Sequence, residues 1–320
     1  MVMGGTFYKD RSVFVTGATG LLGSWLTKRL VELGANVVIL VRDWQPESEL
    51  LRNGCYDKVR RVSGDIRDYY LLKRILAEYE VQSVFHLAAQ TIVAIANHDP
   101  IGTLDQNIIG TAKVLETCRL VNTVEHIIVA SSDKAYGDSL ILPYTEEMGL
   151  NGRHPYDVSK SCSDLVALMF EHTYDMPIAV TRCGNLYGGG DLNFSRLIPK
   201  TIKRLLNGQP PQVYGDGSMK RDYTYVEDAV DAYLTIGMKG CRGAYNVAGG
   251  EVRTILEVVD TISKLVDIDI PPLISGEKTP EIDSQWLNID KIKGIGWSPT
   301  FTLDQGLKKT IDWYKEYFNG

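Results

Sequence analysis

The stretch VFVTGATGLLG, residues 13–23, decides the fold of this chain. A short β-branched and aromatic run ends in three glycines at G-x-x-G-x-x-G spacing, and a helical pattern of leucines follows from Leu21 to Gly34. A second apolar run, Val37 to Val41, is closed by Arg42 and Asp43. The order strand, glycine turn, helix, strand, acid predicts a βαβ unit of a parallel sheet.

Each glycine of the turn has a physical reason when the turn contacts a pyrophosphate. Gly17 allows the tight turn, Gly20 lets the backbone approach the phosphates, and Gly23 lets the helix pack close to the sheet. The first turn of the helix offers free N–H groups and a partial positive charge to the anion. We therefore predict that this turn binds a dinucleotide.

Composition narrows the class of protein. The net charge of the 320-residue chain is −6, and its Lys and Arg residues are dispersed, so we expect no nucleic-acid surface. No apolar run approaches the roughly 20 residues of a membrane span, and the first ten residues lack the apolar core of a signal peptide. The five cysteines are scattered without a C-x-x-C, and the five histidines have no metal-ligand spacing. These features predict a cytosolic protein without a membrane span or a metal.

Strands and helices alternate through the first half of the chain. The apolar pattern predicts further strands at residues 59–63, 83–87, 126–130 and 178–181, and helices through residues 71–76, 104–120 and 156–174. Such alternation predicts an α/β fold of the Rossmann type, a doubly wound parallel sheet with ligands at the carboxyl ends of its strands.

The pattern changes after Cys183. We expect a loop at 188–191, helices at 195–206, 226–238, 255–266 and 303–318, a strand and turn at 212–217, and a strand at 244–247. We interpret residues 1–182 as the NAD(P)-binding domain and residues 183–320 as a smaller α/β substrate-binding region. Segments near 220–250 are expected to interleave with the sheet domain.

Tyr156 and Lys160 lie one helical turn apart, so both side chains reach the same side of the helix. A tyrosine ordinarily titrates near 10. A nearby ammonium, together with a positive nicotinamide ring, would favour the phenolate and lower the tyrosine pKa. The same pair can also occur on the surface of a helix. Because Tyr156 and Lys160 follow the fifth strand of a dinucleotide-binding fold, we favour an active site.

Several further motifs extend along most of the chain. They are GDIRD at 64–68, HLAAQ at 86–90, Asn107, YDVSK at 156–160, RCGNLYG at 182–188, VYGDG at 213–217 and RDYTYVED at 221–228. With TGATGLLG at 16–23, these motifs resemble the extended short-chain dehydrogenase/reductases that modify nucleotide sugars. The resemblance implies a nucleoside-diphosphate sugar as substrate and a homodimer as the assembly.

The same resemblance implies roles for four side chains. Tyr156 would be the base that removes the sugar hydroxyl proton, and Lys160 would bind the nicotinamide ribose and tune Tyr156. Ser132 would hold the same hydroxyl. Asn107 would support the active-site helix and its water.

The pair Asp133-Lys134 after the fifth strand is similar to the CDP-glucose 4,6-dehydratases. In that group the Asp is implied to protonate the leaving C6 hydroxyl, and Lys134 would stand in the place of the C5 base. Ser132 departs from the usual Thr of the dehydratases. A nucleotide-sugar 4-epimerase and a non-catalytic NAD-binding regulator remain the alternatives, and a solvated turn is the alternative for the pair itself.

The resemblance also implies the cofactor contacts. Gly17, Gly20, Leu22, Gly23, Ala88, Tyr156 and Lys160 would hold the cofactor, and Asp65 and Ile66 would flank the adenine. Arg42 suits the 2′-phosphate of NADP, whereas Asp43 suits the free ribose hydroxyls of NAD and would repel that phosphate. We expect NAD, with NADP as the alternative.

Four polar residues are the candidates for substrate binding. Asn185, Arg196 and Arg221 match family positions that hold the diphosphate, a task that suits the two-pronged guanidinium of arginine. Gln90 would face the sugar.

Overall fold

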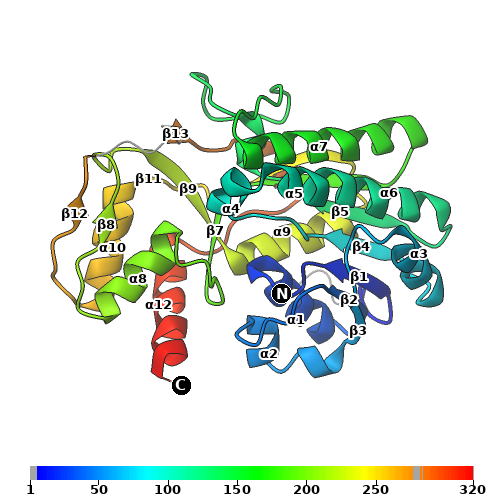
Figure 1. Ribbon diagram of the computed structural model, residues 1–320, viewed down its shortest axis with the longest axis horizontal. Helices are drawn as coiled ribbons and strands as arrows, with labels where there is room; N and C mark the ends of the chain where they lie inside the picture. The colour runs from blue at the N-terminus through cyan, green and yellow to red at the C-terminus, as the bar shows by residue number, and fades with distance from the viewer. Residues whose placement is uncertain (1–5, 277–281, 283, 320) are drawn as a thin grey trace.

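The computed structural model describes residues 6–276, 282 and 284–319. Its central layer is a seven-stranded parallel sheet with the order β10-β6-β5-β4-β1-β2-β3 (Figure 1). The strands are β1 Ser12–Thr16, β2 Asn36–Val41, β3 Arg60–Ser63, β4 Ser83–His86, β5 His126–Ala130, β6 Ile178–Cys183 and β10 Gly243–Val247. The direction of winding reverses between β1 and β4, which is where an open α/β sheet binds its ligand.

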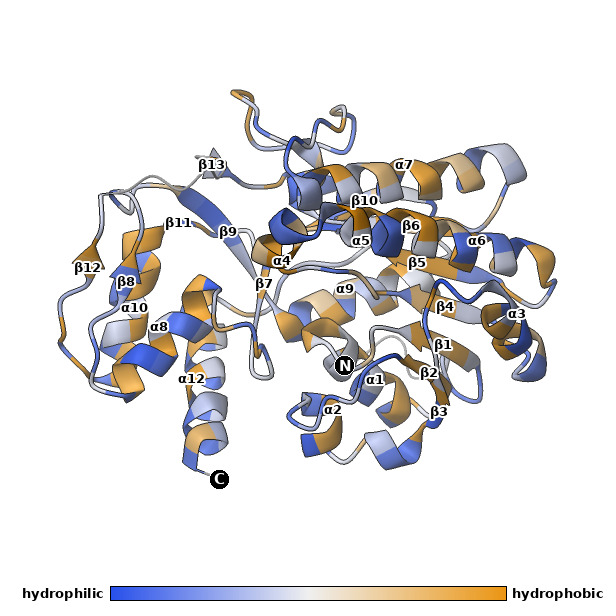
Figure 2. Ribbon diagram, in the orientation of Figure 1, coloured by the Kyte–Doolittle hydropathy of each residue, from blue (hydrophilic) through white to orange (hydrophobic). Residues whose placement is uncertain are grey.

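Helices cover both faces of this sheet because alternate strand residues point to opposite sides. Val13 and Val15 belong to one buried cluster, and Phe14 between them belongs to the other. The Val13 side is covered by α1 Leu21–Glu32 and α9 Val226–Met238, and the Phe14 side by α3 Tyr69–Glu78, α6 Gly110–Leu120 and α7 Pro155–Tyr174. Figure 2 shows hydrophobic residues along these central strands.

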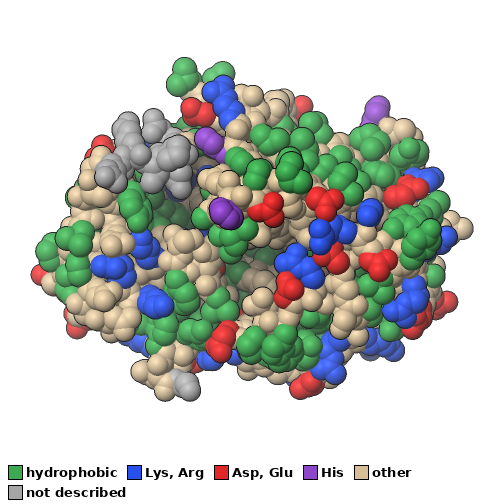
Figure 3. Space-filling view, in the orientation of Figure 1, with side chains coloured by type: hydrophobic (Ala, Val, Ile, Leu, Met, Phe, Trp, Pro, Cys, Tyr) green, Lys and Arg blue, Asp and Glu red, His purple; other side chains and the backbone are tan. Residues whose placement is uncertain are grey.

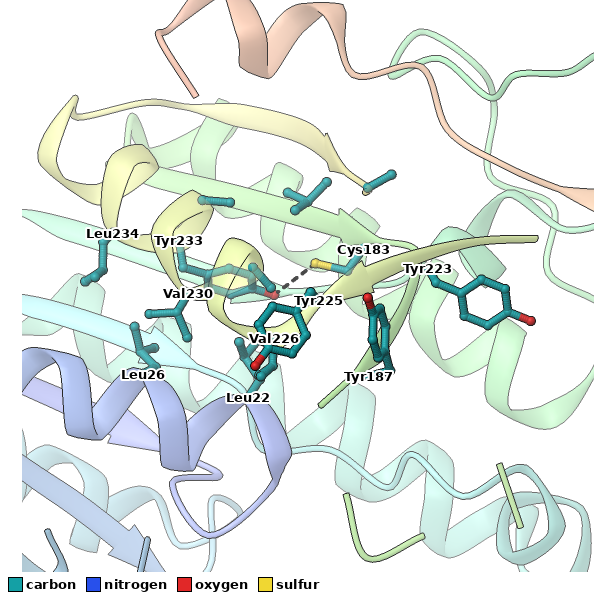
Figure 4. Close-up of a cluster of buried hydrophobic side chains, with 14 of the residues drawn as sticks. Leu22, Leu26, Cys183, Tyr187, Tyr223, Tyr225, Val226, Val230, Tyr233 and Leu234 are labelled. Carbon is teal, nitrogen blue, oxygen red and sulfur yellow. Dashed lines mark hydrogen bonds between the residues drawn. The ribbon is translucent and has the colours of Figure 1, made fainter. Parts of the chain in front are cut away.

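The Val13 side continues into the smaller region without a break. In Figure 4, leucines of α1 face valines of α9. Tyr187, Tyr223 and Tyr225, from strands that precede α9 in the chain, extend the same cluster. The Tyr233 hydroxyl lies 3.5 Å from Cys183 Sγ, at the end of β6. This shared core joins the two parts of the chain through packed apolar side chains.

The smaller region contains two short sheets and three longer helices (Figure 1). One sheet has the order β11-β9-β13, with β7 also paired to β9, and the other pairs β12 with β8. The strands are β7 Asn185–Tyr187, β8 Gln212–Val213, β9 Lys220–Tyr225, β11 Val252–Thr254, β12 Leu273–Ile274 and β13 Ser284–Gln285. The helices are α8 Leu197–Leu206, α10 Ile255–Val266 and α12 Leu303–Asn319, with the short α11 Asp290–Gly294 between the last two.

One strand of the second half completes the main sheet. β10 pairs in parallel with β6, from Gly243 opposite Ala179 to Val247 opposite Cys183. α9, which precedes β10, packs against α1 on the Val13 side. The chain therefore returns to the sheet before it completes the smaller region.

The sequence pattern was wrong about one long helix. Residues 100–120 form α5 Pro100–Leu104, a π-helical turn Asp105–Ile109 and then α6, in place of one helix over 104–120. The wider turn lets the adjacent side chains of Gln106 and Asn107 both be buried. π-turns are frequent at functional sites.

Smaller differences concern short elements. The helix expected at 195–206 begins at Leu197, because Arg196 is its extended N-cap. The strand and turn expected at 212–217 are present as the strand Gln212–Val213 and a turn at residues 215–216. The helices α2 Glu49–Arg52 and α4 Val93–His98 were not predicted, since four to six residues give too little periodicity. The doubly wound parallel sheet itself is confirmed.

Candidate active site

The predicted cofactor and catalytic residues follow the carboxyl ends of β1 to β5, apart from Asn107 in the π-helical turn and Tyr156 and Lys160 on α7. These ends belong to neighbouring parallel strands, so the loops that follow them lie side by side. Figure 3 shows a hollow on one face of the molecule, between the main sheet and the part that carries α8, α10 and α12.

Two glycines of the turn are required by the protein itself. Gly17 has φ +74°, and a Cβ added there would lie 2.7 Å from the Ala88 nitrogen. A Cβ on Gly23 would lie 2.1 Å from the Gly17 oxygen. Gly17 and Gly23 thus allow the turn to pack against the β4 loop and against α1.

Gly20 is different, because nothing in the protein requires a glycine there. Its φ is −79°, and the nearest atom to an added Cβ is the Gly17 oxygen at 3.4 Å, an ordinary contact. The α1 helix that starts after it has no side-chain cap and no acid in its first turn. An open helix N-terminus beside a glycine that leaves space free fits a pyrophosphate, as the sequence predicts.

The end of β2 presents a charged pair. Arg42 Nε donates to Asp43 Oδ2 over 2.7 Å, and Arg42 Nη1 donates to Gln106 Oε1 over 3.1 Å. The Asp43 side chain is 55% exposed, so its carboxylate can also meet a ligand. Asp43 already neutralises much of the charge that Arg42 would offer a 2′-phosphate.

The loop after β3 holds the residues expected beside the adenine. Asp65 accepts from the Arg67 backbone N–H and guanidinium, and these hydrogen bonds lower the pKa of its carboxyl. The Ile66 side chain is buried and packs where Gly110 leaves room for it. Asp65 therefore lies at the surface of this loop, while Ile66 anchors the loop to α6.

A buried histidine ties the glycine turn to the π-helical turn. His86 Nε2 lies 2.9 Å from the Thr111 hydroxyl, which itself donates to the Asn107 carbonyl over 2.6 Å. His86 Nε2 must therefore carry the proton, and Nδ1 accepts from Thr16 over 2.8 Å. Burial, aided by the Lys160 charge, lowers the pKa of His86 to about 3 and keeps the ring neutral.

Both the oxygen and the nitrogen of the Asn107 side-chain amide are hydrogen-bonded. Its Oδ1 accepts from the Gln90 N–H over 2.7 Å, and its Nδ2 donates to the Gln90 carbonyl over 3.0 Å and to Ser159 Oγ over 2.8 Å. Ser159 Oγ in turn donates to the Tyr156 carbonyl over 2.7 Å. Asn107 thus fixes both the loop after β4 and the first turn of α7. The Gln90 side chain folds back, with Oε1 accepting from the Ile92 N–H.

Tyr156 and Lys160 are both buried on the inner side of α7. Burial raises the pKa of Tyr156 to about 12, and the Arg196 charge and the nearby Ser132 hydroxyl oppose this rise. Burial lowers the pKa of Lys160 to about 8, and its ammonium donates to the Ala130 carbonyl over 2.9 Å. The protein alone therefore holds Tyr156 protonated, and lowering its pKa needs a further positive charge at the site.

The loop after β5 forms a 3₁₀ turn, Asp133–Tyr136, capped by Ser132. Ser132 Oγ accepts from the Lys134 N–H and donates to Asp133 Oδ1 over 3.0 Å. Asp133 is 3% exposed, and its Oδ2 has no hydrogen-bond partner among the described residues. Burial raises the pKa of Asp133 against the Lys134 charge. Because Asp133 is buried and the half-buried Lys134 donates to Gln285, this pair is not the solvated turn of the alternative interpretation.

The residues expected to hold a diphosphate come from three elements of the smaller region. Asn185 on β7 donates to the Asp222 carbonyl over 3.2 Å. Arg196 before α8 pairs with Asp191 over 3.1 Å, and its side chain is 38% exposed. Arg221 on β9 is buried and donates to the carbonyls of Lys220 and Ile282. Arg196 is the more accessible of the two guanidinium groups.

Sequence reasoning missed four residues at this site. Ser159 lies inside the YDVSK motif, and His86 opens HLAAQ, so motif membership was the available signal. Asp222 follows Arg221 in RDYTYVED and is almost completely buried. Gln285, which accepts from Lys134 Nζ over 3.4 Å, comes from β13, whose approach no local pattern indicates.

Over residues 6–276, 282 and 284–319, no group of three or more His, Cys, Asp or Glu is placed to hold a metal ion. Within the same part of the chain, no helix combines the length and the apolar character needed to cross a membrane.

Comparison with known proteins places the chain among nucleotide-sugar enzymes. It is 31% identical to a CDP-glucose 4,6-dehydratase of Salmonella typhimurium, over 98% of this chain and 93% of the relative. It is also 31% identical, over 97% of its own length, to a trifunctional enzyme of Arabidopsis thaliana named for UDP-glucose 4,6-dehydratase, 3,5-epimerase and reductase activities. The chain spans about half of that plant relative, 48% of its length.

The solved structures that superpose on this chain include an epimerase and a 4,6-dehydratase. An epimerase from Methanothermobacter thermautotrophicus superposes with a TM-score of 0.91 at 30% identity, covering 99% of this chain and 96% of that one. A dTDP-glucose 4,6-dehydratase from Bacillus anthracis, in complex with NAD, superposes with a TM-score of 0.86 at 28% identity, covering 97% and 98%.

The family model for GDP-mannose 4,6 dehydratase matches residues 14–310. This range includes the glycine turn, the Tyr156 and Lys160 pair, the Asp133 turn and most of the smaller region. The chain therefore belongs to the GDP-mannose 4,6 dehydratase family, within the nucleotide-sugar group of extended short-chain dehydrogenase/reductases that its motifs predict.

Proposed function

We propose that this protein is an NAD-dependent nucleotide-sugar 4,6-dehydratase, which converts a nucleoside-diphosphate hexose to the 4-keto-6-deoxy sugar. The observation that carries the proposal is Asp133, a buried carboxyl whose Oδ2 has no partner among the described residues. An acid that must protonate a poor leaving group needs a raised pKa, and burial raises that of Asp133.

The cofactor site rests on the glycine turn. The N–H groups at the start of α1 and the space beside Gly20 suit the pyrophosphate, with Leu22 and Ala88 next to it. Asp43 suits the free hydroxyls of the adenine ribose, and Lys160 suits the nicotinamide ribose. When bound, NAD takes a hydride from C4 of the sugar and later returns it to C6.

Tyr156 is the proposed base at the C4 hydroxyl. Its pKa of about 12 in the protein alone is too high for proton removal at neutral pH, so the positive cofactor ring would have to lower it. Ser132 lies close enough to Tyr156 to influence its pKa, and it can hold the same sugar hydroxyl. Asn107 and Ser159 keep α7 in register with the loop that carries Gln90.

Asp133 and Lys134 divide the elimination between them. The C4 ketone acidifies the C5 hydrogen, and Lys134, in its neutral form, is the proposed base that removes it as a proton. Asp133 then protonates the C6 hydroxyl, which leaves as water. The C5 proton returns from Lys134 to C5 when the hydride is delivered to C6. Gln285 accepts from Lys134 Nζ and keeps the amine beside the turn.

The diphosphate is proposed to lie over the smaller region. Arg196 is partly exposed just before α8, and its positive charge opposes the rise in the pKa of Tyr156. Arg196 therefore lies at the border of the site. Arg221 and Asn185 lie on adjacent strands of the same sheet and complete the phosphate end.

A homodimer in the cytosol is the proposed assembly and location. Large apolar side chains are exposed where α5 and α7 pack together, with Ile101 73%, Leu165 55% and Met169 44% exposed. A second copy of the chain would bury such a face. Sedimentation equilibrium of the protein and of Ile101→Glu tests this assignment, since the variant should be monomeric.

A 4-epimerase is the second candidate, because the epimerase from Methanothermobacter thermautotrophicus superposes with a TM-score of 0.91. Epimerisation uses Tyr156 and Lys160 but has no need of an acid at C6. The two candidates therefore differ at Asp133.

The deciding experiment incubates the protein with a panel of nucleotide sugars and measures product mass. Loss of one water supports dehydration, an isomer of unchanged mass supports epimerisation, and no product with any sugar supports a non-catalytic NAD-binding regulator. In the dehydratase, Asp133→Asn should still reduce bound NAD on substrate addition but release no 4-keto-6-deoxy product. Normal turnover by Asp133→Asn would overturn the proposal.

A further inference from the structure

Four buried polar atoms without a hydrogen-bond partner among the described residues belong to Asp133, in the 3₁₀ turn after β5, and to the strands β9 and β13. They are Asp133 Oδ2, Asp222 Oδ1, Thr224 Oγ1 and Gln285 Nε2. A buried polar atom without a partner costs on the order of 1–3 kcal/mol, so four in one neighbourhood call for an explanation.

These atoms come together through β9 and its neighbours. A Cβ added to Gly184 would lie 2.4 Å from Asp222 Oδ1 and 3.6 Å from Thr224 Oγ1, so both atoms flank the same backbone position after β6. Gln285 pairs in register with Arg221, next to Asp222. The same Gln285 accepts from Lys134, the neighbour of Asp133.

One oxygen of Asp222 is fixed and the other is not. Oδ2 accepts from the Leu287 N–H over 2.9 Å, which sets the orientation of the carboxyl. Oδ1 is left facing Gly184 and Thr224. Two carboxyl oxygens, one hydroxyl and one amide N–H together can accept and donate, which is the set that a bridging water or a shared proton needs.

The charges around the two carboxyls favour protonation of the pair. Burial raises the pKa of Asp222 to about 8, and the Asp133 charge is the second cause. The Arg221 charge opposes this rise, and for Asp133 the Lys134 charge opposes it most. Two buried carboxyls close together cannot both ionise at low energetic cost. They therefore titrate as a coupled pair, and no pKa belongs to one residue alone.

We propose that Asp222 is a positioning residue for Asp133, and that the two buried carboxyls share protons. This proton store keeps Asp133 in the protonated form that it needs to protonate the leaving hydroxyl. The inference rests on the proposed dehydration, because only that reaction uses Asp133 as an acid. It adds a second carboxyl to a site in which the family motifs indicate one.

The proton balance needs no further reactant. When Asp133 protonates the C6 hydroxyl, the C6–O bond breaks and water leaves. The O–H bond of Asp222 then breaks, its proton reaches Asp133 through one bridging water, and the negative charge moves to Asp222. In each turnover Tyr156 gains one proton from the C4 hydroxyl, and the two carboxyls lose one proton to the leaving water. Release of the proton from Tyr156 and uptake of one proton by the carboxyls restore the starting state.

The test is the pH dependence of turnover in Asp222→Asn, measured on the full chain with NAD and the sugar that the wild type dehydrates. The variant keeps an oxygen for the Leu287 N–H but holds no proton to give. We expect kcat at pH 7.5 to fall at least about tenfold. We also expect the alkaline limb of kcat to move to lower pH by about one unit, with KM and NAD reduction on substrate addition retained.

Asp228→Asn is the matched control. Asp228 is equally buried and lies in the first turn of α9. Its oxygens accept from the Thr300 and Phe301 backbone N–H groups and from the Thr300 hydroxyl. Its loss should lower stability and leave the alkaline limb in place. If Asp222→Asn does not fold, Thr224→Val removes one donor of the same set and should move the limb in the same direction.

The outcomes separate the two proposals. A wild type that dehydrates its sugar, with an unchanged alkaline limb in Asp222→Asn and in Thr224→Val, overturns the proton store and leaves the dehydratase standing. A wild type that yields only an epimer removes the dehydratase, and the proton store falls with it.

Discussion

Asn107 and Ser159 are joined by a 2.8 Å hydrogen bond that ties the π-helical turn to the helix carrying Tyr156. Ser159 passes the connection on by donating to the Tyr156 carbonyl. The amide of Asn107 therefore orients the base through one hydroxyl and holds the loop after β4 through Gln90.

Ser159→Ala should loosen this connection. The variant leaves Asn107 Nδ2 with the Gln90 carbonyl alone, and a lost buried hydrogen bond costs about 1–2 kcal/mol. We expect kcat to fall about tenfold with NAD affinity nearly unchanged. Ser163→Ala is the control, since Ser163 is buried one turn further on and donates only to the Lys160 carbonyl. Equal kinetics in the two variants would contradict the proposed role of Ser159.

Gly20 and Gly23 should respond oppositely to alanine. Gly20→Ala meets no atom closer than 3.4 Å, so the protein should fold with a near-normal melting temperature and bind NAD at least about tenfold more weakly. Gly23→Ala would place its methyl 2.1 Å from the Gly17 oxygen and should lower the yield of folded protein. Calorimetric titration with NAD and thermal melts measure both. Tight NAD binding by Gly20→Ala would contradict the assignment of the pyrophosphate to this turn.

Tyr156→Phe should nearly abolish turnover while leaving sugar-nucleotide binding largely intact. The change removes one hydroxyl, and a general acid–base group is typically worth about 10²–10⁴ in rate. The wild-type phenol should remain protonated up to about pH 12 without cofactor and ionise at lower pH with NAD bound. Absorbance of tyrosinate in the wild type minus that in the variant measures this shift. Near-normal activity of the variant would exclude Tyr156 from the mechanism.

Asp43→Ala should relax the preference for NAD over NADP. The carboxylate would repel a 2′-phosphate, and its ion pair with Arg42 occupies the guanidinium. Removing it frees Arg42, so we expect NADP affinity to rise and NAD affinity to fall. Binding of both cofactors by fluorescence gives the ratio. A wild type that already binds NADP more tightly would mean that Arg42 decides the choice.

His86 should make the protein less stable in acid. Its folded pKa of about 3 lies below the ordinary value of 6.5, so the unfolded chain binds more protons between these values. The His86 contribution to the unfolding free energy is therefore complete above about pH 6.5 and is lost as pH falls toward about 3. His86→Gln should show a weaker loss between pH 7 and pH 4 in urea titrations, whereas exposed His172→Gln should match the wild type.

Much of this architecture follows from local pattern. The helices α9 and α10 and the strand β5 have the predicted bounds, because each shows a clean period between clear ends. The glycine turn was predictable since its spacing and its flanking strand and helix agree. The family was predictable from motifs that extend along nearly the whole chain, and the comparisons confirm it.

The remainder depends on contacts that no local window contains. The π-helical turn arises because Gln106 and Asn107 are both drawn inward, toward Arg42 and toward the loop after β4. Gln285 reaches Lys134 only because β13 adds to β9. The burial that raises the pKa of Asp222 comes from several strands at once, so its motif membership gave no sign of it.

The pairing of β10 with β6 limits how this gene product can be divided. A fragment that stopped at residue 182 would leave β6 as an unprotected edge strand, with its row of N–H and C=O groups open to other chains. It would also lose α9 and uncover the apolar face that α1 shares with it. Such a fragment should aggregate rather than bind cofactor by itself, whereas permuted chains opened at an exposed loop would keep the edge covered.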